Sequence, residues 1–181
     1  MDTTEIIAQI IGIFAMFFNL FSYQQKTRKR AIICQLFGTI LFTINFFMLG
    51  ATVGAIMNFI GAVRAVIFIN KEKLKADHIG WFAGFTAIYL VSYILTFTVL
   101  GKEPTAVNFI LEFLPVIGMI ATTHSYRLTD AKAIRKFGLI SSPVWLVYNI
   151  ANFSVGAIIC EVLSLGSIII GIVRLDRKKK E

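Results

Sequence analysis

The apolar run from Val155 to Ile172 carries a carboxylate, Glu161, about two turns after its start. An acid inside a membrane-spanning helix must be paired, protonated or in contact with water, and such acids are usually functional. Gln9, Asn58 and Glu112 lie at similar depths in other apolar runs, roughly 5–11 Å below the outer helix ends at ~1.5 Å of rise per residue. A ring of polar groups at one level favours a solute-binding site, with hydrogen bonds that only hold helices together as the structural alternative.

The four polar residues belong to an internal repeat. Residues 103 positions apart match along the two halves of the chain: Gln9 with Glu112, Gly12 with Pro115, Met16 with Met119, Ser22 with Ser125, Tyr23 with Tyr126, and Asn58 with Glu161. The sequence Val-Gly-Ala-Ile recurs at positions 53 and 155, an offset of 102. The chain is therefore predicted to contain one three-helix unit twice, with a spacer between the copies.

The composition places these helices in a membrane. The chain has 181 residues, of which 57% are hydrophobic and 15% charged, and a mean hydropathy of +0.77, which excludes a soluble globular domain. The net charge of +8 comes from short basic runs between apolar segments, the pattern of cytoplasmic loops and not of a nucleic-acid-binding surface. No Cys or His spacing indicates a metal, and we expect no cofactor.

Seven spans can be drawn, and their basic loops orient the chain. The predicted spans are Ile6–Tyr23, Ala31–Leu49, Val53–Ile69, Ile79–Leu100, Thr105–Thr123, Phe137–Ala151 and Val155–Ile172, with short turns at 50–51 and 152–154. Of the 18 Lys and Arg residues, 16 follow the first, third, fifth and seventh spans, so the N-terminus is predicted outside and the C-terminus in the cytoplasm.

An odd number of helices in each copy explains the single helix between the copies. A three-helix unit ends on the face opposite its start, so one linker helix returns the chain and makes the two copies parallel. We therefore predict an all-α integral membrane protein with a 3+1+3 arrangement. Its parts are a first repeat at 1–70, a linker with one transmembrane helix at 71–104, and a second repeat with a basic tail at 105–181.

Other residues have both functional and structural interpretations. Arg64 lies inside the third span, where it could pair with a carboxylate, bind an anionic solute, or extend to lipid headgroups, the simplest of the three. Tyr148 and Asn149 could line an outer vestibule. Four residues inside spans are candidate hinges or simple kinks: Pro115, Pro143, Gly12 and Gly38.

Several short motifs carry a resemblance to a known family. They are Glu112–Gly118 (EFLPVIG), Trp145–Asn149 (WLVYN), Val155–Ile158 followed by Glu161, Phe46–Gly50 (FFMLG), and Asn58 with Arg64. Through them the chain resembles the YgjV-type bacterial inner-membrane proteins over nearly its whole length. The resemblance implies a multi-pass protein of the bacterial inner (plasma) membrane.

That family is similar in plan to the SWEET and PQ-loop transporters, which have the same 3+1+3 arrangement. In SWEET carriers, asparagines on the third and seventh helices bind sugar and helix prolines act as hinges. The resemblance implies a binding role for Asn58 and hinge roles for Pro115 and Pro143. Glu161 stands where a sugar carrier has asparagine and the first repeat lacks the prolines, so the pattern argues against a neutral sugar.

The leading hypothesis is a small-solute transporter that works by alternating access between two three-helix halves. Its substrate is expected to be polar or cationic, with proton coupling as an option. Its expected partners are the lipid bilayer and, in a homo-oligomer, a second copy of the chain, but not nucleic acid. The alternative is a scaffold or regulatory subunit whose polar residues only hold helices together. An enzyme is not expected, because no nucleophile–base pair or metal set lies at one depth.

Overall fold

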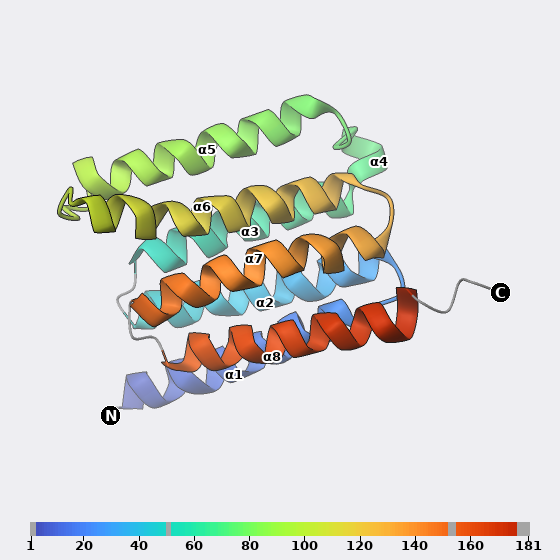
Figure 1. Cartoon of the computed structure of the whole chain (residues 1–181), viewed down its shortest axis with the longest axis horizontal. Coiled ribbons are helices and arrows are strands. Elements are labelled where there is room, and N and C mark those ends of the chain that lie inside the picture. Colours follow the sequence, from blue (N-terminus) through green and yellow to red (C-terminus); the bar gives the residue numbers. More distant parts are fainter. Residues whose placement is uncertain (1–2, 50–51, 152–154, 177–181) are drawn as a thin grey trace.

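The computed structural model describes residues 3–49, 52–151 and 155–176, and all regular structure in these ranges is helical. The predicted turns at 50–51 and 152–154 and the basic tail from 177 lie outside the described residues. Figure 1 shows long helices side by side along one axis. In chain order the elements are α1 (Thr3–Tyr23), α2 (Arg28–Met48), α3 (Thr52–Ile69), α4 (Lys71–Leu74), α5 (Ile79–Thr98), α6 (Ala106–Arg127), α7 (Ala131–Ala151), α8 (Val155–Gly171) and the π-helix η1 (Ile172–Asp176).

Three helices extend further into the basic segments than hydropathy predicted. Helix α2 begins at Arg28 because the Thr27 side chain accepts a hydrogen bond from the Arg30 backbone N–H at 3.4 Å and caps the helix. Helix α6 continues to Arg127, and α7 begins at Ala131, six residues before the predicted span. Backbone hydrogen bonds do not require apolar side chains, so a helix can extend past the apolar run that the hydropathy marks.

Five segments are long and apolar enough to cross a membrane: Thr3–Tyr23, Arg28–Met48, Ile79–Thr98, Ala106–Arg127 and Ala157–Asp176. Helix α3 gives a shorter apolar stretch, Gly54–Ile69. Helix α7 has Lys132, Arg135 and Lys136 in its first turns, which lower its mean hydropathy. The all-helical membrane fold is thus confirmed, and the count of seven spans stays a prediction.

The packing of α1–α3 repeats in α6–α8. Within each group the helices pack in chain order, α1 on α2 on α3 and α6 on α7 on α8. Between the groups, α1 packs on α8, α3 on α6, and α2 on α7. Exchanging the two groups leaves this list of neighbours unchanged. Helix α5 packs mainly on α6 and breaks the symmetry (Figure 1).

The outside of the bundle is apolar. Phe14, Phe17 and Phe21 on α1 expose 57%, 60% and 61% of their surface, while Ala8 and Ala15 on the opposite face are fully buried against the other helices. An apolar exterior of this kind requires lipid as its solvent.

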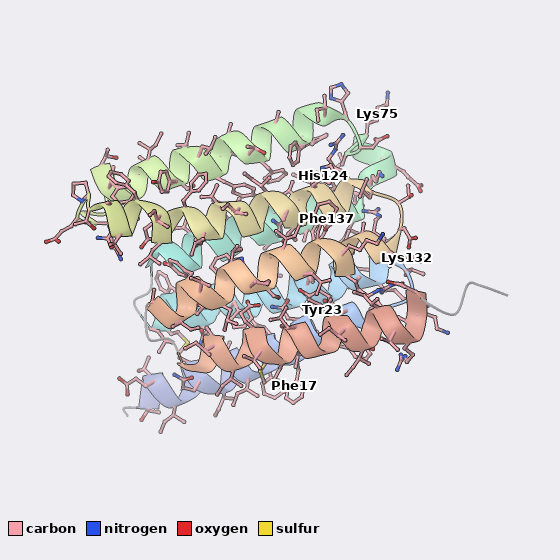
Figure 2. The ribbon with its side chains drawn as sticks, in the orientation of Figure 1. Phe17, Tyr23, Lys75, His124, Lys132 and Phe137 are labelled. Carbon is pink, nitrogen blue, oxygen red and sulfur yellow. The ribbon has the colours of Figure 1, made fainter. Side chains whose placement is uncertain are left out.

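The connections α1–α2, α3–α5 and α6–α7 and the η1 segment lie at one end of the bundle, which we call the basic end. Lys75 and Lys132 mark it in Figure 2. The opposite end, where α1 and α6 begin and α2 and α5 finish, is called the far end. Of the basic residues that the structure describes in connecting segments, Lys102 lies at the far end.

Candidate functional site

A cavity of about 130 Å³ lies between the six helices of the two groups. At about 30 Å³ for each molecule of liquid water, this volume corresponds to roughly four waters, enough for a small solute. Its lining side chains come from α1, α2, α3, α6, α7 and α8: Asn19, Tyr23, Gln35, Thr39, Phe42, Phe46, Asn58, Arg64, Met119, Thr122, Tyr126, Ser141, Ser142, Trp145, Asn149, Ala157, Cys160, Glu161 and Ser164. Helix α5 contributes none of them.

Most of this lining is contributed twice, once by each three-helix group. Six pairs of lining residues lie 103 positions apart: Asn19 with Thr122, Tyr23 with Tyr126, Thr39 with Ser142, Phe42 with Trp145, Phe46 with Asn149, and Asn58 with Glu161. The cavity therefore lies where the two three-helix groups face each other. Arg64 departs from this pattern, because its counterpart Ser167 is not a lining residue and instead donates to the Leu20 carbonyl at 2.8 Å.

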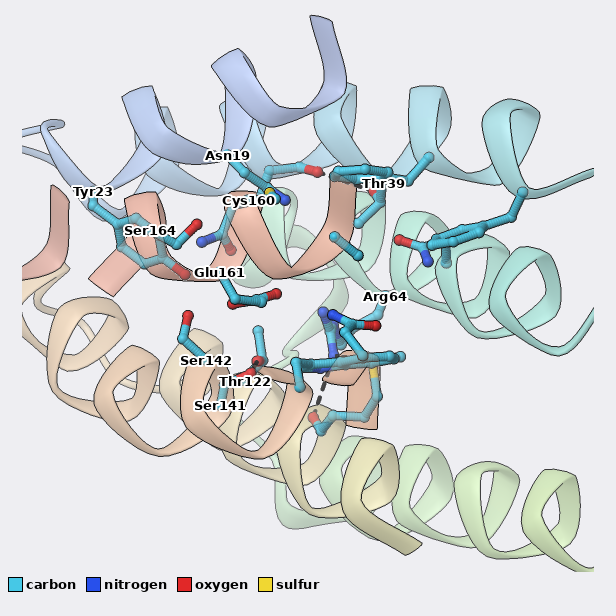
Figure 3. A pocket seen from close by; sticks show the side chains of 18 of the residues that line it. Asn19, Tyr23, Thr39, Arg64, Thr122, Ser141, Ser142, Cys160, Glu161 and Ser164 are labelled. Atoms are coloured by element: carbon cyan, nitrogen blue, oxygen red, sulfur yellow. Dashed lines mark hydrogen bonds between the residues drawn. The ribbon is translucent and has the colours of Figure 1, made fainter. Parts of the chain in front are cut away.

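Glu161 is half-buried on α8 and points into the cavity (Figure 3). The hydroxyl groups of Ser142 on α7 and Tyr23 on α1 approach it. Hydroxyl groups can donate to a carboxylate or pass a proton to it. This part of the wall suits a cation or a proton.

Arg64 lies in the wall on α3, only 3% exposed. Its Nη1 donates to the Met119 carbonyl at 3.2 Å, Thr123 Oγ1 at 3.3 Å and Tyr89 Oη at 3.3 Å, and the guanidinium carbon lies 5.0 Å from the centre of the Tyr126 ring. The prediction that Arg64 extends to lipid headgroups is wrong, because these acceptors and the Tyr126 ring hold the guanidinium inside the bundle.

Asn58 and Asn149 also line the cavity. The Asn58 amide donates to the Gly54 carbonyl of its own helix at 2.9 Å, so this bond does not join two helices. Its side-chain oxygen remains available as an acceptor at the cavity wall. Of the predicted binding residues, the structure thus brings together Asn58, Asn149, Arg64 and Glu161.

Three predicted binding residues lie outside the cavity, so the expected ring of Gln9, Asn58, Glu112 and Glu161 does not form. Gln9 is exposed because α1 turns the face of Ala8 and Ala15 inward, and none of the described helices covers the face beside it. Glu112 is buried, but it pairs with Lys102 from the α5–α6 connection at 3.0 Å. Tyr148 approaches Glu112 and not the cavity.

The Lys102–Glu112 pair should stabilise the fold. Their side chains are 37% and 5% exposed, so Lys102→Met leaves a buried carboxylate without its counter-ion. We expect a loss of about 2 kcal/mol, less than for a fully buried pair because water reaches Lys102. The apparent melting temperature of the purified protein in detergent measures this loss.

Adding Glu112→Gln to Lys102→Met should recover most of that stability, because the orphan charge is then gone. Glu103→Gln, at an exposed acid in the same connection, serves as the control. Equal melting temperatures for the single and double variants would show that the pair does not act as a unit.

The predicted hinge glycines lie at close contacts between α1 and α2. A Cβ at Gly12 would stand 3.0 Å from Asn45 Nδ2, and one at Gly38 would stand 2.9 Å from Asn19 Oδ1. These contacts give both glycines a packing role. Pro115 and Pro143 lie inside α6 and α7, which continue through them. Hinge motion at these four positions remains a prediction.

The pairs that line the cavity could have been found from the repeat. Thr39 with Ser142 and Phe42 with Trp145 match at the same offset that pairs Asn58 with Glu161. Sequence reasoning missed them because hydroxyl and aromatic residues are common in ordinary membrane helices, so their presence alone does not indicate a binding site.

A helical bundle with an apolar exterior and a polar cavity between two similar three-helix groups defines a polytopic membrane protein. The chain belongs to the Imp-YgjV family of bacterial inner membrane proteins, whose family model matches residues 6–179. Neither a curated protein nor a solved structure matches the chain. The family assignment establishes the bacterial inner membrane as the location, as the motifs predicted.

Proposed function

We propose that this protein carries a small polar solute across the inner membrane by alternating access. The observation that carries the proposal is the cavity lined by six residue pairs, one member from each repeat, with α5 excluded. Parallel-repeat carriers bind their solute between the repeats. We infer the same for the seven long helices here, arranged as two three-helix halves, α1–α3 and α6–α8, with α5 as the linker.

The basic end is taken as the cytoplasmic end, since basic loops are retained in the cytoplasm. This orientation places the N-terminus outside. It also places Tyr23, Gln35 and Tyr126 at the cytoplasmic side of the cavity, and Phe46, Asn149 and Ala157 towards the outside.

Two arginines join the halves at the cytoplasmic end. Arg28 on α2 donates from Nη1 to the Tyr126 carbonyl at 2.9 Å, and Arg135 on α7 donates from Nη1 to the Tyr23 carbonyl at 3.3 Å. The two acceptors are equivalent residues of the repeat. Charge-assisted bonds to a carbonyl are stronger than neutral ones, so they favour a state closed at this end, and they must break when the halves separate there.

Uptake into proteoliposomes tests the proposal. Purified protein should accumulate at least one labelled solute from a panel of sugars, amino acids and polyamines, and Glu161→Gln should remove most of that flux without lowering the melting temperature. Glu103→Gln, at an exposed acid away from the cavity, should leave flux unchanged. Because Glu161 faces the cavity, its charge acts on the solute and not on helix packing.

The competing interpretation is a membrane scaffold that moves no solute. It predicts no flux above empty liposomes for any member of the panel. It also predicts that Glu161→Gln alters only the stability of the bundle. That combined result would reject the transport proposal.

A further inference from the structure

The cavity contains two formally charged side chains of opposite sign that do not neutralise each other. Arg64 is on α3 and Glu161 on α8, and these helices lie in different halves, at diagonal positions of the six-helix array. Among the described residues, ion pairs within 4.0 Å join Lys102 to Glu112 and Arg135 to Asp176. Neither pair includes Arg64 or Glu161. Charges inside a membrane bundle are costly without a partner.

The guanidinium of Arg64 is fixed on one side and unpartnered on another. Its Nη1 donates hydrogen bonds to the Met119 carbonyl, Thr123 Oγ1 and Tyr89 Oη. Its buried Nε has no hydrogen-bond partner among the described residues. Nε and Nη2 form the edge that binds a carboxylate through two parallel hydrogen bonds. Arg64 lines the cavity, so a solute carboxylate that reaches this edge meets an N–H group with no competing acceptor among the described residues. Because Nε is itself closed to water, a small shift of the Arg64 side chain is part of this binding.

Glu161, the residue of opposite charge, can bind an ammonium group. Glu161 offers carboxylate oxygens, and the nearby Ser142 and Tyr23 hydroxyls offer further acceptors. The wall also includes the apolar rings of Phe42, Phe46 and Trp145. A solute with both charges and a short hydrocarbon part can therefore match the two charged groups and the aromatic rings that face the cavity.

We propose that the substrate is a small zwitterionic amino acid, with its carboxylate on Arg64 and its ammonium on Glu161. The proposal rests on the carrier function proposed above and names its substrate class. A zwitterion pairs both of these charges at once and adds no net charge to the cavity, which reduces the cost of carrying it through the membrane. The volume of about 130 Å³ favours a compact amino acid.

Trp145 provides a direct reporter, because it lines the cavity and Trp81 does not. In a Trp81→Phe background, titration with L-alanine should change Trp145 emission in a saturable way. L-Alaninol keeps the ammonium but lacks the carboxylate, and L-lactate keeps the carboxylate but lacks the ammonium. Each should bind at least tenfold more weakly than L-alanine, and glycerol should not bind.

Two variants test which charged group of the solute each of the two residues binds. Arg64→Gln should remove the preference for L-alanine over L-alaninol, and Glu161→Gln should remove the preference over L-lactate, while Glu103→Gln should change neither. L-Alaninol or glycerol binding as tightly as L-alanine would overturn the inference, as would no response to L-alanine. Binding is measured in detergent, independently of transport. Flux of another solute class would therefore reject the amino acid as substrate and leave the carrier function standing. Binding of L-alanine without flux of any solute would reject the carrier function alone.

Discussion

A cross-link between α1 and α8 near the basic end should stop solute flux completely. The Ser167 hydroxyl donates to the Leu20 carbonyl at 2.8 Å, so cysteines at positions 20 and 167 lie within reach of a short reducible methanethiosulfonate cross-linker. In the proposed carrier these helices belong to different halves, and opening at the basic end would require them to separate. Flux in proteoliposomes measures the effect, and reduction of the cross-link should restore it.

A cross-link within one half is the control, because it does not prevent α1 from separating from α8. Asn45 Nδ2 donates to the Ala8 carbonyl at 2.7 Å, and both residues are buried in the first half. The A8C/N45C pair should cross-link equally well and leave most of the flux. Both pairs require a C34A/C160A background that transports, because Cys160 lines the cavity. Full flux through the 20–167 cross-linked protein would contradict movement of one half against the other.

The internal repeat was the most informative feature of the sequence. The offset that pairs Asn58 with Glu161 also pairs residues along the cavity wall, although it equally pairs Gln9 with Glu112, which lie outside the cavity. Hydropathy located the helices, since apolar runs must form helices in a membrane to satisfy their backbone groups. It did not locate their basic ends, because lysines and arginines lower the hydropathy of the first turns of α2 and α7, although Ala31, Ala131 and Ile134 are buried there.

The direction of each side chain could not be predicted from depth alone. Gln9 and Glu112 occupy equivalent positions in the repeat, yet Gln9 is exposed and Glu112 is buried against Lys102. The difference comes from the α5–α6 connection, which only the second half has beside its first helix. Arg64 is the converse case: its burial depends on acceptors from α5 and α6, which are distant in sequence. Contacts of this kind join residues that are distant in sequence, so no local sequence pattern indicates them.

Substitution of Arg64 by Met should cost about 100-fold in L-alanine affinity without destabilising the bundle. Two charge-assisted hydrogen bonds of ~1.5 kcal/mol each account for the lost affinity. Methionine is flexible enough to fill the space of the arginine stem. The acceptors of Arg64 keep other hydrogen-bond partners in this variant. Tyr89 Oη and Thr123 Oγ1 lie 2.9 Å apart, and Thr123 donates to the Met119 carbonyl at 2.7 Å.

Removing a buried charge that has no carboxylate partner should even stabilise the fold, by about 1–4 kcal/mol. The melting temperature in detergent and the Trp145 titration, measured on the same sample, separate the two effects. Arg64→Lys is the matched control: it keeps the charge and loses the planar edge, so it should recover part of the affinity and none of the stability. A large fall in melting temperature for Arg64→Met would instead identify Arg64 as a structural link between α3 and α6, and the anion contact would then need another residue.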